Sequence, residues 1–356
     1  MATPKKKKRR TKAGLPPGSV VFLGNQKVEK VFVHHLQYDN EQLNENTLDN
    51  HKDITFQATD NEQIDWYDVR GLHDTALIES IGKTFHIHPL VLEDVVNTQQ
   101  RPKFEEYENG IFIIFKSLFF DKTKFEITTE QVALFLTNGL ILSFQEAETD
   151  LFAAVRQRVH SGRGRIRLRG IDYLAYALLD NVVDNYYVIF DEIEEVIEAL
   201  EDQLMASPDN SIKGQIHHLK KELLTIRKSI APLREAVSQF AKSDNELIED
   251  RTVVYIRDLY DHTVQIMDRV ETYRDMLNGL QDLYLSEISY KMNQVMQLLA
   301  VVTTVFVPLS FLAGLYGMNF ENIPELKYAN GYFVLLGVMV LIVVGLLFFF
   351  RKKKWF

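Results

Sequence analysis

The chain has 356 residues, of which 46% are hydrophobic and 25% are charged, and this mixture is typical of a folded protein rather than a disordered one. It contains no cysteine, which excludes disulfides, thiolate catalysis and iron–sulfur clusters, so any metal must be bound by oxygen or histidine nitrogen. The formal net charge of −9 excludes an overall basic surface for nucleic acid.

Residues 1–18 are predicted to be a flexible basic tail, in which six consecutive cations from Lys5 to Arg10 precede a stretch rich in Gly and Pro. No apolar run of the length that a secretory signal needs follows these charges, so export by that route is not predicted. We interpret the tail as a solvated segment that can touch anionic lipid. A nuclear-localisation or nucleic-acid role of the same cations is the alternative.

Residues 19–150 have the pattern of an N-terminal α/β domain. Short runs rich in β-branched and aromatic residues, bounded by Gly, Asn and Asp, predict strands. The pattern predicts helices over residues 75–83 and 89–96, the second with Pro89 in its first turn. The predicted strands are residues 20–23, 54–56, 64–69, 111–115 and 140–144.

Residues 151–245 are predicted to be mainly helical, with an antiparallel pair of helices over residues 171–205 and 212–240. Pro208 marks the break between the two helices. The first helix carries a row of acidic side chains between Asp191 and Asp202, which we interpret as a solvated face.

A single long helix is predicted to follow, comprising a stalk over residues 246–291 and a first membrane span over residues 292–320. Apolar residues recur at helical spacing and no proline occurs between residue 246 and Pro308, so the helix is expected to be continuous from about residue 251 to residue 316, roughly 100 Å at 1.5 Å per residue. The span has 29 residues without a charge, more than a bilayer core requires. Because so long a helix cannot bury its apolar stripe against one small domain, we expect the chain to form oligomers.

A second membrane helix is predicted over residues 331–350, after an outer loop at 321–330. Two buried core helices are the alternative, but the second run is too long and too uniformly apolar for one. The basic end at residues 351–356 places the C-terminus in the cytoplasm, and a two-span hairpin then places the N-terminus there too. The modest net charge thus conceals three parts: residues 13–291 hold 28 basic and 47 acidic residues, a net −19, between two cationic ends.

The motif Gly317-Met318-Asn319 ends the first span and is followed by Pro324-Glu325-Leu326, the second span and the closing basic run. In this position the motif resembles that of CorA-type magnesium transporters, and residues 85–94, 100–103 and 257–263 are similar to the family as well. The resemblance covers nearly the whole chain after Gly18. It implies a funnel-shaped homopentamer in the cell (inner) membrane, with an α/β cytoplasmic domain, a long stalk helix lining a central pore and the second span packed outside; it implies no enzyme.

The resemblance also implies roles for residues of the pore. Five copies of Asn319 with the backbone of Gly317 would form a selectivity filter of neutral oxygens, suited to Mg²⁺ because this ion sheds its water reluctantly. Glu321 and Glu325 would concentrate cations at the outer mouth. A simple helix cap at Gly317 and Asn319 is the structural alternative. The matching pore-lining positions, most of them on one face at steps of three or four, are Asn293, Met296, Leu299, Thr303, Val307, Ser310 and Gly314.

In the family, Mg²⁺ bound between subunits holds the pore closed, and the matching carboxylates are Asp94 and Asp258, with Glu93 and Asp180 as further candidates. Carboxylates that face one another repel unless a cation bridges them. The alternative is that Asp94 and Asp258 are surface carboxylates or salt-bridge partners.

The expected function is therefore potential-driven influx of Mg²⁺, which serves as both cargo and regulator. An inside-negative potential of about 100 mV gives a divalent cation about 4.6 kcal/mol, so no ATP site is required, and the sequence has no Walker-type loop. Transport of Co²⁺, Ni²⁺ or Zn²⁺ on the same architecture is one alternative. A membrane-tethered coiled-coil sensor or scaffold is the other. The histidine pairs His34-His35, His86 with His88, and His217-His218 lack a third ligand nearby in the sequence, so they do not predict a zinc site.

Overall fold

The structure is a computed structural model that describes residues 14–48, 56, 63–321 and 323–355. The chain divides into two compact units. The first comprises Met1–Asp202 and Asn210–Gly279, and the second comprises Gln203–Asp209 and Leu280–Phe356.

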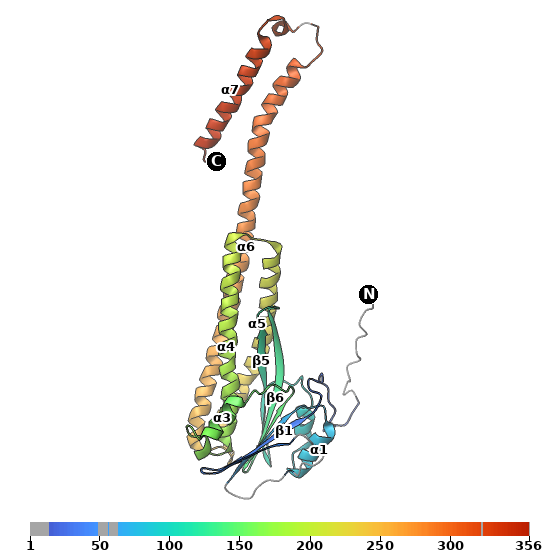
Figure 1. The fold of residues 1–356 in the computed structure, drawn as a ribbon, viewed down its shortest axis with the longest axis vertical. Helices are drawn as coiled ribbons and strands as arrows, with labels where there is room; N and C mark the ends of the chain where they lie inside the picture. The colour runs from blue at the N-terminus through green and yellow to red at the C-terminus, as the bar shows by residue number, and fades with distance from the viewer. Residues whose placement is uncertain (1–13, 49–55, 57–62, 322, 356) are drawn as a thin grey trace. The chain divides into compact units, whose positions relative to one another are not determined.

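A seven-stranded mixed sheet organises the N-terminal half of the first unit (Figure 1). Its strand order is β2-β1-β3-β7-β6-β5-β4, and every neighbouring pair is antiparallel except β3 and β7. A parallel pair needs a long crossover, which here includes two helices and three strands. The strands are β1 Phe32–Tyr38, β2 Leu43–Leu48, β3 Ile64–Arg70, β4 Lys103–Tyr107, β5 Gly110–Asp121, β6 Glu126–Thr137 and β7 Leu140–Gln145.

The strands predicted at residues 64–69, 111–115 and 140–144 are confirmed within β3, β5 and β7. The strand predicted at residues 20–23 is wrong. This segment has no regular secondary structure: Leu23 N–H donates to the carbonyl of Val96 at 3.2 Å, and Val20 and Phe22 pack against the core. Its apolar residues therefore serve packing rather than sheet pairing. Of the strand expected at 54–56, residues 54 and 55 lie outside the described part of the chain.

The two predicted helices are confirmed as α1 (Thr75–Thr84) and α2 (Pro89–Val95), and both pack against the sheet and complete its core. Asp74 caps α1 by accepting a hydrogen bond from Leu77 N–H at 3.1 Å, and Pro89 occupies the first turn of α2. Buried side chains of both helices share one apolar cluster with those of β3, β5, β6 and β7. The helices of the chain are α1 Thr75–Thr84, α2 Pro89–Val95, α3 Ala153–Ser161, α4 Ile171–Ala206, α5 Asn210–Lys242, α6 Asp250–Tyr316 and α7 Gly331–Lys352, with 3-10 turns at Ile166–Leu168 and Pro324–Lys327.

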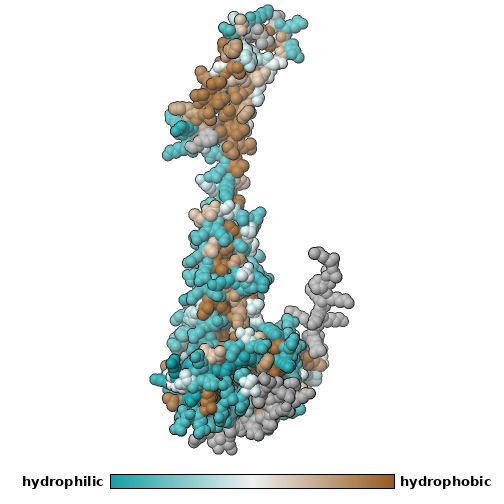
Figure 2. All heavy atoms as spheres, in the orientation of Figure 1, coloured by the Kyte–Doolittle hydropathy of each residue, from teal (hydrophilic) through white to brown (hydrophobic). Residues whose placement is uncertain are grey.

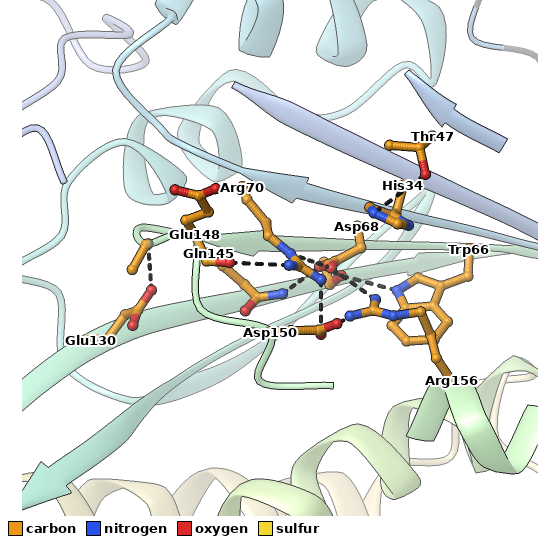
Figure 3. A network of polar contacts seen from close by, with 12 residues as sticks. His34, Thr47, Trp66, Asp68, Arg70, Glu130, Gln145, Glu148, Asp150 and Arg156 are labelled. Carbon is orange, nitrogen blue, oxygen red and sulfur yellow. Dashed lines mark hydrogen bonds and ion pairs between the residues drawn. The ribbon is translucent and has the colours of Figure 1, made fainter. Parts of the chain in front are cut away.

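A buried polar network ties α3 to the sheet (Figure 3). Asp68 of β3 is fully buried and forms ion pairs with Arg70 at 3.0 Å and with Arg156 of α3 at 3.1 Å. Ser143 of β7 also donates to Asp68, at 2.6 Å. The Arg156 guanidinium lies over the Trp66 ring, 5.4 Å from its centroid. Paired in this way, the buried charges can be tolerated in the interior.

Helices α4, α5 and α6 lie side by side in the first unit (Figure 1). Tyr273 of α6 donates to Glu194 of α4 at 2.7 Å, and Arg227 of α5 pairs with Glu271 of α6 at 3.3 Å. Phe240 of α5 stacks on Phe104 of β4, which joins the helices to the sheet. The predicted helical pair is confirmed, although part of the acidic face of α4 contacts α6 rather than solvent alone.

The predicted continuous helix is confirmed as α6, which has 67 residues and is followed by the apolar helix α7. Both helices are long and apolar enough to cross a membrane. Figure 2 shows apolar side chains gathered over α7 and the C-terminal part of α6. The two helices meet near the C-terminal end of α7 in the second unit, where Val301 and Phe350 are buried and Gln297 donates to the carbonyl of Trp355 at 3.2 Å.

Candidate functional site

The Gly-Met-Asn motif directly follows the last residue of α6. Gly317 N–H donates to the carbonyl of Ala313 at 3.0 Å and Met318 N–H to that of Leu315 at 3.4 Å, so the last turn closes onto the motif. A Cβ atom added at Gly317 would lie 3.0 Å from the Ala313 carbonyl oxygen, which is tight. Asn319 is exposed, so its amide is accessible at the helix end.

The predicted pore-lining residues share a face of α6 that no other described part of the chain covers. All seven, from Asn293 to Gly314, are exposed. The more buried positions of this part of α6 form a different stripe, which includes Gln297, Val301 and Tyr316 and packs toward α7. At about 100° per residue, the two stripes lie on nearly opposite sides of the helix. The exposed face is therefore available to other copies of the chain.

Polar side chains on this face are unusual for a membrane helix in contact with lipid. Asn293 and Ser310 are exposed, and the Thr303 hydroxyl donates to the Leu299 carbonyl at 2.7 Å while its oxygen can still accept. Transfer of such polar groups into hydrocarbon is unfavourable in free energy, so they tend to face other protein or water. This favours a water-lined or protein-covered face.

Two acidic residues, Glu321 and Glu325, lie between α6 and α7. Glu321 is exposed directly after the motif. Glu325 lies in the 3-10 turn Pro324–Lys327, and its side chain is outside the described part of the chain.

Asp94 and Glu93 on α2 already have partners in the single chain. Asp94 forms an ion pair with Lys103 at 2.7 Å and accepts a hydrogen bond from Gln100. Partial burial of Lys103 would lower its pKa, but hydrogen bonds to Asp94 and Glu105 raise it overall. Glu93 accepts from the N–H of Gly18 at 2.5 Å. The alternative of a salt-bridge partner thus holds for Asp94 within one chain.

Asp180 and Asp258 belong to a second group, the α4–α6 carboxylate cluster, made up of Asp180, Asp184, Asp258 and His262. One ligand atom each from Asp180, Asp184 and His262 lies within 4.8 Å of the others. Asp258 lies one turn before His262 on α6. Its carboxylate is 3.9 Å from His262 Nε2, and its side chain is 66% exposed. The structure thus brings Asp180 and Asp258 together, whereas Asp94 pairs with Lys103.

The electrostatics of this cluster favour a cation. Burial raises the pKa of Asp180 to about 6, and the neighbouring Asp184 contributes in the same direction. His262 Nδ1 is buried and has no hydrogen-bond partner among the described residues. Carboxylate oxygens suit Mg²⁺, while an imidazole nitrogen suits transition metals such as Co²⁺, so the donor set fits either kind of divalent ion.

The sequence analysis did not single out Asp184 and His262. The available signal was the spacing of Asp180 with Asp184 and of Asp258 with His262, each four residues apart and so on one helix face. That α4 and α6 bring these two pairs together is visible only in the packing.

Comparison with known proteins agrees with this architecture. A family model described as "CorA-like Mg2+ transporter protein" matches residues 61–352. The chain is 43% identical over 345 residues to the cobalt/magnesium transport protein CorA of Thermotoga maritima, covering 97% of each chain. It is 29% identical over 299 residues to the protein of the same name from Methanocaldococcus jannaschii, covering 82% of this chain and 90% of that one.

The fold agrees as well. The complete structure of the CorA magnesium transporter from Methanocaldococcus jannaschii matches with a TM-score of 0.76 at 27% identity, covering 90% of this chain and 98% of that chain. The match extends over the sheet, the long helix and the apolar helices alike. The chain therefore belongs to the CorA-like Mg²⁺ transporter family.

Proposed function

We propose that the chain is a Mg²⁺ channel that admits the ion into the cytoplasm along the membrane potential. The observation that carries this proposal is the exposed face of α6, which has polar side chains at intervals and ends at Gly317-Met318-Asn319. A pore needs such a face, because one helix alone encloses no channel. The family of the chain and the cobalt/magnesium transport named for its relatives support the same conclusion.

The working assembly is a homopentamer with α6 of each copy around a central axis. Five Asn319 amides and five Gly317 carbonyls then surround the ion with neutral oxygens, which bind the water shell of Mg²⁺ without removing it. Met296 and Leu299 narrow the pore with apolar side chains, and Glu321 attracts cations to its mouth. The uniformly apolar α7 faces lipid outside this ring.

Intracellular Mg²⁺ closes this pore by binding between subunits. Asp94 and Glu93 of one copy approach Asp258 and Asp180 of its neighbour, and a cation relieves the repulsion between them. The ion pair of Asp94 with Lys103 is a competitor, so binding must displace or share this lysine. The raised pKa of Asp180 supports the proposal, since burial and the neighbouring Asp184 disfavour its charged form, and a bound cation would offset both effects.

Co²⁺ or Ni²⁺ is the alternative cargo or regulator, and one observation favours it. His262 contributes a nitrogen to the α4–α6 carboxylate cluster, and transition metals bind imidazole more readily than Mg²⁺ does. Fluxes measured with each ion separately decide between them, and the same assay covers Zn²⁺.

Flux into liposomes tests the pore. We expect purified protein to take up Mg²⁺ when the interior is negative, and Asn319→Ala to abolish most of the uptake. The matched control is Asn330→Ala, because Asn330 is also an exposed asparagine but its side chain makes no cap hydrogen bond at α7. No uptake by the unmodified protein would favour the scaffold alternative, and equal losses in both variants would reject Asn319 as the filter.

Patch-clamp recording at controlled internal Mg²⁺ tests the regulatory carboxylates. We expect Asp94→Lys with Asp258→Lys to conduct at an internal Mg²⁺ concentration that closes the unmodified channel. Asp261→Lys is the control, since it adds a lysine to an exposed position on the same helix. Currents of the double variant that stay Mg²⁺-inhibited would reject this pair as the sensor.

A further inference from the structure

A basic segment stands out from the acidic body of the chain. Between α3 and α4, arginine occupies every second position, at Arg163, Arg165, Arg167 and Arg169, and we call residues 163–169 the arginine segment. Isolated arginines at a surface need no explanation, but four in seven residues concentrate positive charge at one place. The pore and the carboxylates described above do not use them.

Two of these arginines line a cavity of about 520 Å³ next to the turn between β1 and β2. Tyr38 lines the same cavity with its side chain almost fully buried, and its hydroxyl has no hydrogen-bond partner among the described residues. Arg169 has a buried Nη1 that likewise lacks a partner there. Buried donors are nearly always hydrogen-bonded, so these two residues of the cavity lining lack an acceptor among the described residues.

The second arginine of the cavity is held in place by the backbone. Arg167 donates from Nε to the Val159 carbonyl at 2.6 Å and from Nη2 to the His160 carbonyl at 3.1 Å. Burial raises the pKa of Tyr38 while the charge of Arg167 acts against this rise, so the hydroxyl keeps its proton and remains a donor.

Asp39, one of the two acidic residues that line the cavity, already accepts hydrogen bonds on both carboxylate oxygens. Asp39 Oδ1 accepts from the backbone N–H groups of Glu41 at 2.8 Å and Gln42 at 2.7 Å, and Oδ2 accepts from Gln63 at 3.0 Å. These hydrogen bonds, that of Gln63 most of all, lower the pKa of Asp39. Glu41 lines the cavity as well, but the buried groups there that lack a partner among the described residues, on Tyr38 and Arg169, are both donors, which favours an anion over a cation.

We propose that this cavity binds a phosphate-bearing small molecule, to which Tyr38, Arg167 and Arg169 donate hydrogen bonds. Phosphate offers several oxygens to the fixed forks of two guanidinium groups and a hydroxyl at once. The volume is that of a small-molecule site and accommodates a nucleotide. The basic residues at the cavity gather at one pocket rather than along an extended stripe, which favours a small molecule over a nucleic-acid strand.

The segment also contacts the long helix, since Arg165 donates to the Tyr255 hydroxyl of α6. A ligand that orders the arginine segment would therefore act on residues adjoining the first turns of α6. The binding proposal does not depend on transport, because binding is measured directly on the purified chain.

Calorimetry on the full chain in detergent tests the proposal, with inorganic phosphate, pyrophosphate and AMP as probes at fixed free Mg²⁺, so that chelation of the metal plays no part. We expect Arg169→Gln to weaken binding about tenfold or more and Tyr38→Phe about threefold to tenfold. Tyr38→Phe removes a hydroxyl that has no partner in the free protein, so the melting temperature without ligand should not fall. Arg163→Gln is the control, because Arg163 is exposed and does not line the cavity.

Each other outcome overturns the proposal. Unchanged affinity in Tyr38→Phe and Arg169→Gln would show that the phosphate binds elsewhere. Equal losses in Arg163→Gln and Arg169→Gln, with none in Tyr38→Phe, would show diffuse attraction to positive charge rather than a built site. Absence of binding by the unmodified chain up to about 10 mM of every probe, weaker than about −3 kcal/mol, would reject the site altogether.

Discussion

At the scale of single residues, Lys116 gives the first unit a distinctive dependence on pH. This lysine of β5 is 8% exposed, and its Nζ donates to the Thr98 carbonyl at 2.8 Å and to Gln131 at 3.2 Å. Burial lowers its pKa from 10.5 to about 8. Between pH 8 and pH 10.5, Lys116 is protonated in the unfolded chain but has lost its proton in the folded chain. The free energy of unfolding should therefore rise with pH across this window, by about 3 kcal/mol in total.

Comparison with Lys116→Met isolates this effect from other groups that titrate in the same range. We expect the stability of the unmodified chain relative to the variant to be lowest below pH 8 and to rise toward pH 10. Thermal unfolding of the full chain in detergent at steps of pH measures the difference. A difference that stays constant with pH would show that Lys116 does not titrate in this window.

At the scale of elements, close backbone packing between β5 and β6 makes one glycine irreplaceable. A Cβ at Gly110 would lie 2.1 Å from the carbonyl oxygen of Leu136 on β6, so Gly110→Ala must push the strands apart. We expect a loss of about 1–3 kcal/mol or more. Gly214→Ala in α5 is the control, because its Cβ would meet nothing within 4 Å and should add about 1 kcal/mol of helix stability. Melting temperatures that rise in both variants would contradict this packing.

Most elements with their own apolar signal could be predicted from the sequence, although the prediction missed β1 and also β6, whose second half is apolar. The core strands β3, β5 and β7 and the long helix α6 carry continuous apolar runs or helical spacing, and they were found. The edge strand β2, with the sequence LNENTL, has no such pattern and is held by pairing with β1. The strand expected at residues 20–23 failed for the opposite reason, since its apolar side chains pack on the core without a partner strand.

The same distinction applies to the candidate site. The position of Gly317-Met318-Asn319 at the end of α6 could be predicted because it depends only on helix length and charge along the chain. The contact of Asp180 with His262 depends instead on how α4 and α6 pack, and the pairing of Asp94 with Lys103 depends on a strand, β4, that was not predicted. Side chains of ordinary type, gathered from distant segments, leave no local pattern.

At the scale of the whole molecule, the distribution of charge defines which parts should face the cytoplasm. Residues 13–291 have a net charge of −19, and the run from Arg351 to Lys354 closes the second apolar helix. Cations next to a span favour the cytoplasmic side, so the first unit and both termini should lie inside, and the loop at residues 321–330 outside.

The absence of cysteine from the chain makes this topology directly measurable, because a single introduced thiol is labelled without background. Glu321 in the loop and Asp244 in the first unit are both exposed acidic residues, so each variant makes the same chemical change on opposite expected sides. We expect Glu321→Cys to react with a membrane-impermeant maleimide in intact cells, and Asp244→Cys to react only after the cells are permeabilised. Labelling of Asp244→Cys in intact cells would place the first unit outside. It would also remove the basis for closure by intracellular Mg²⁺, since the α4–α6 carboxylate cluster would then contact the external solution.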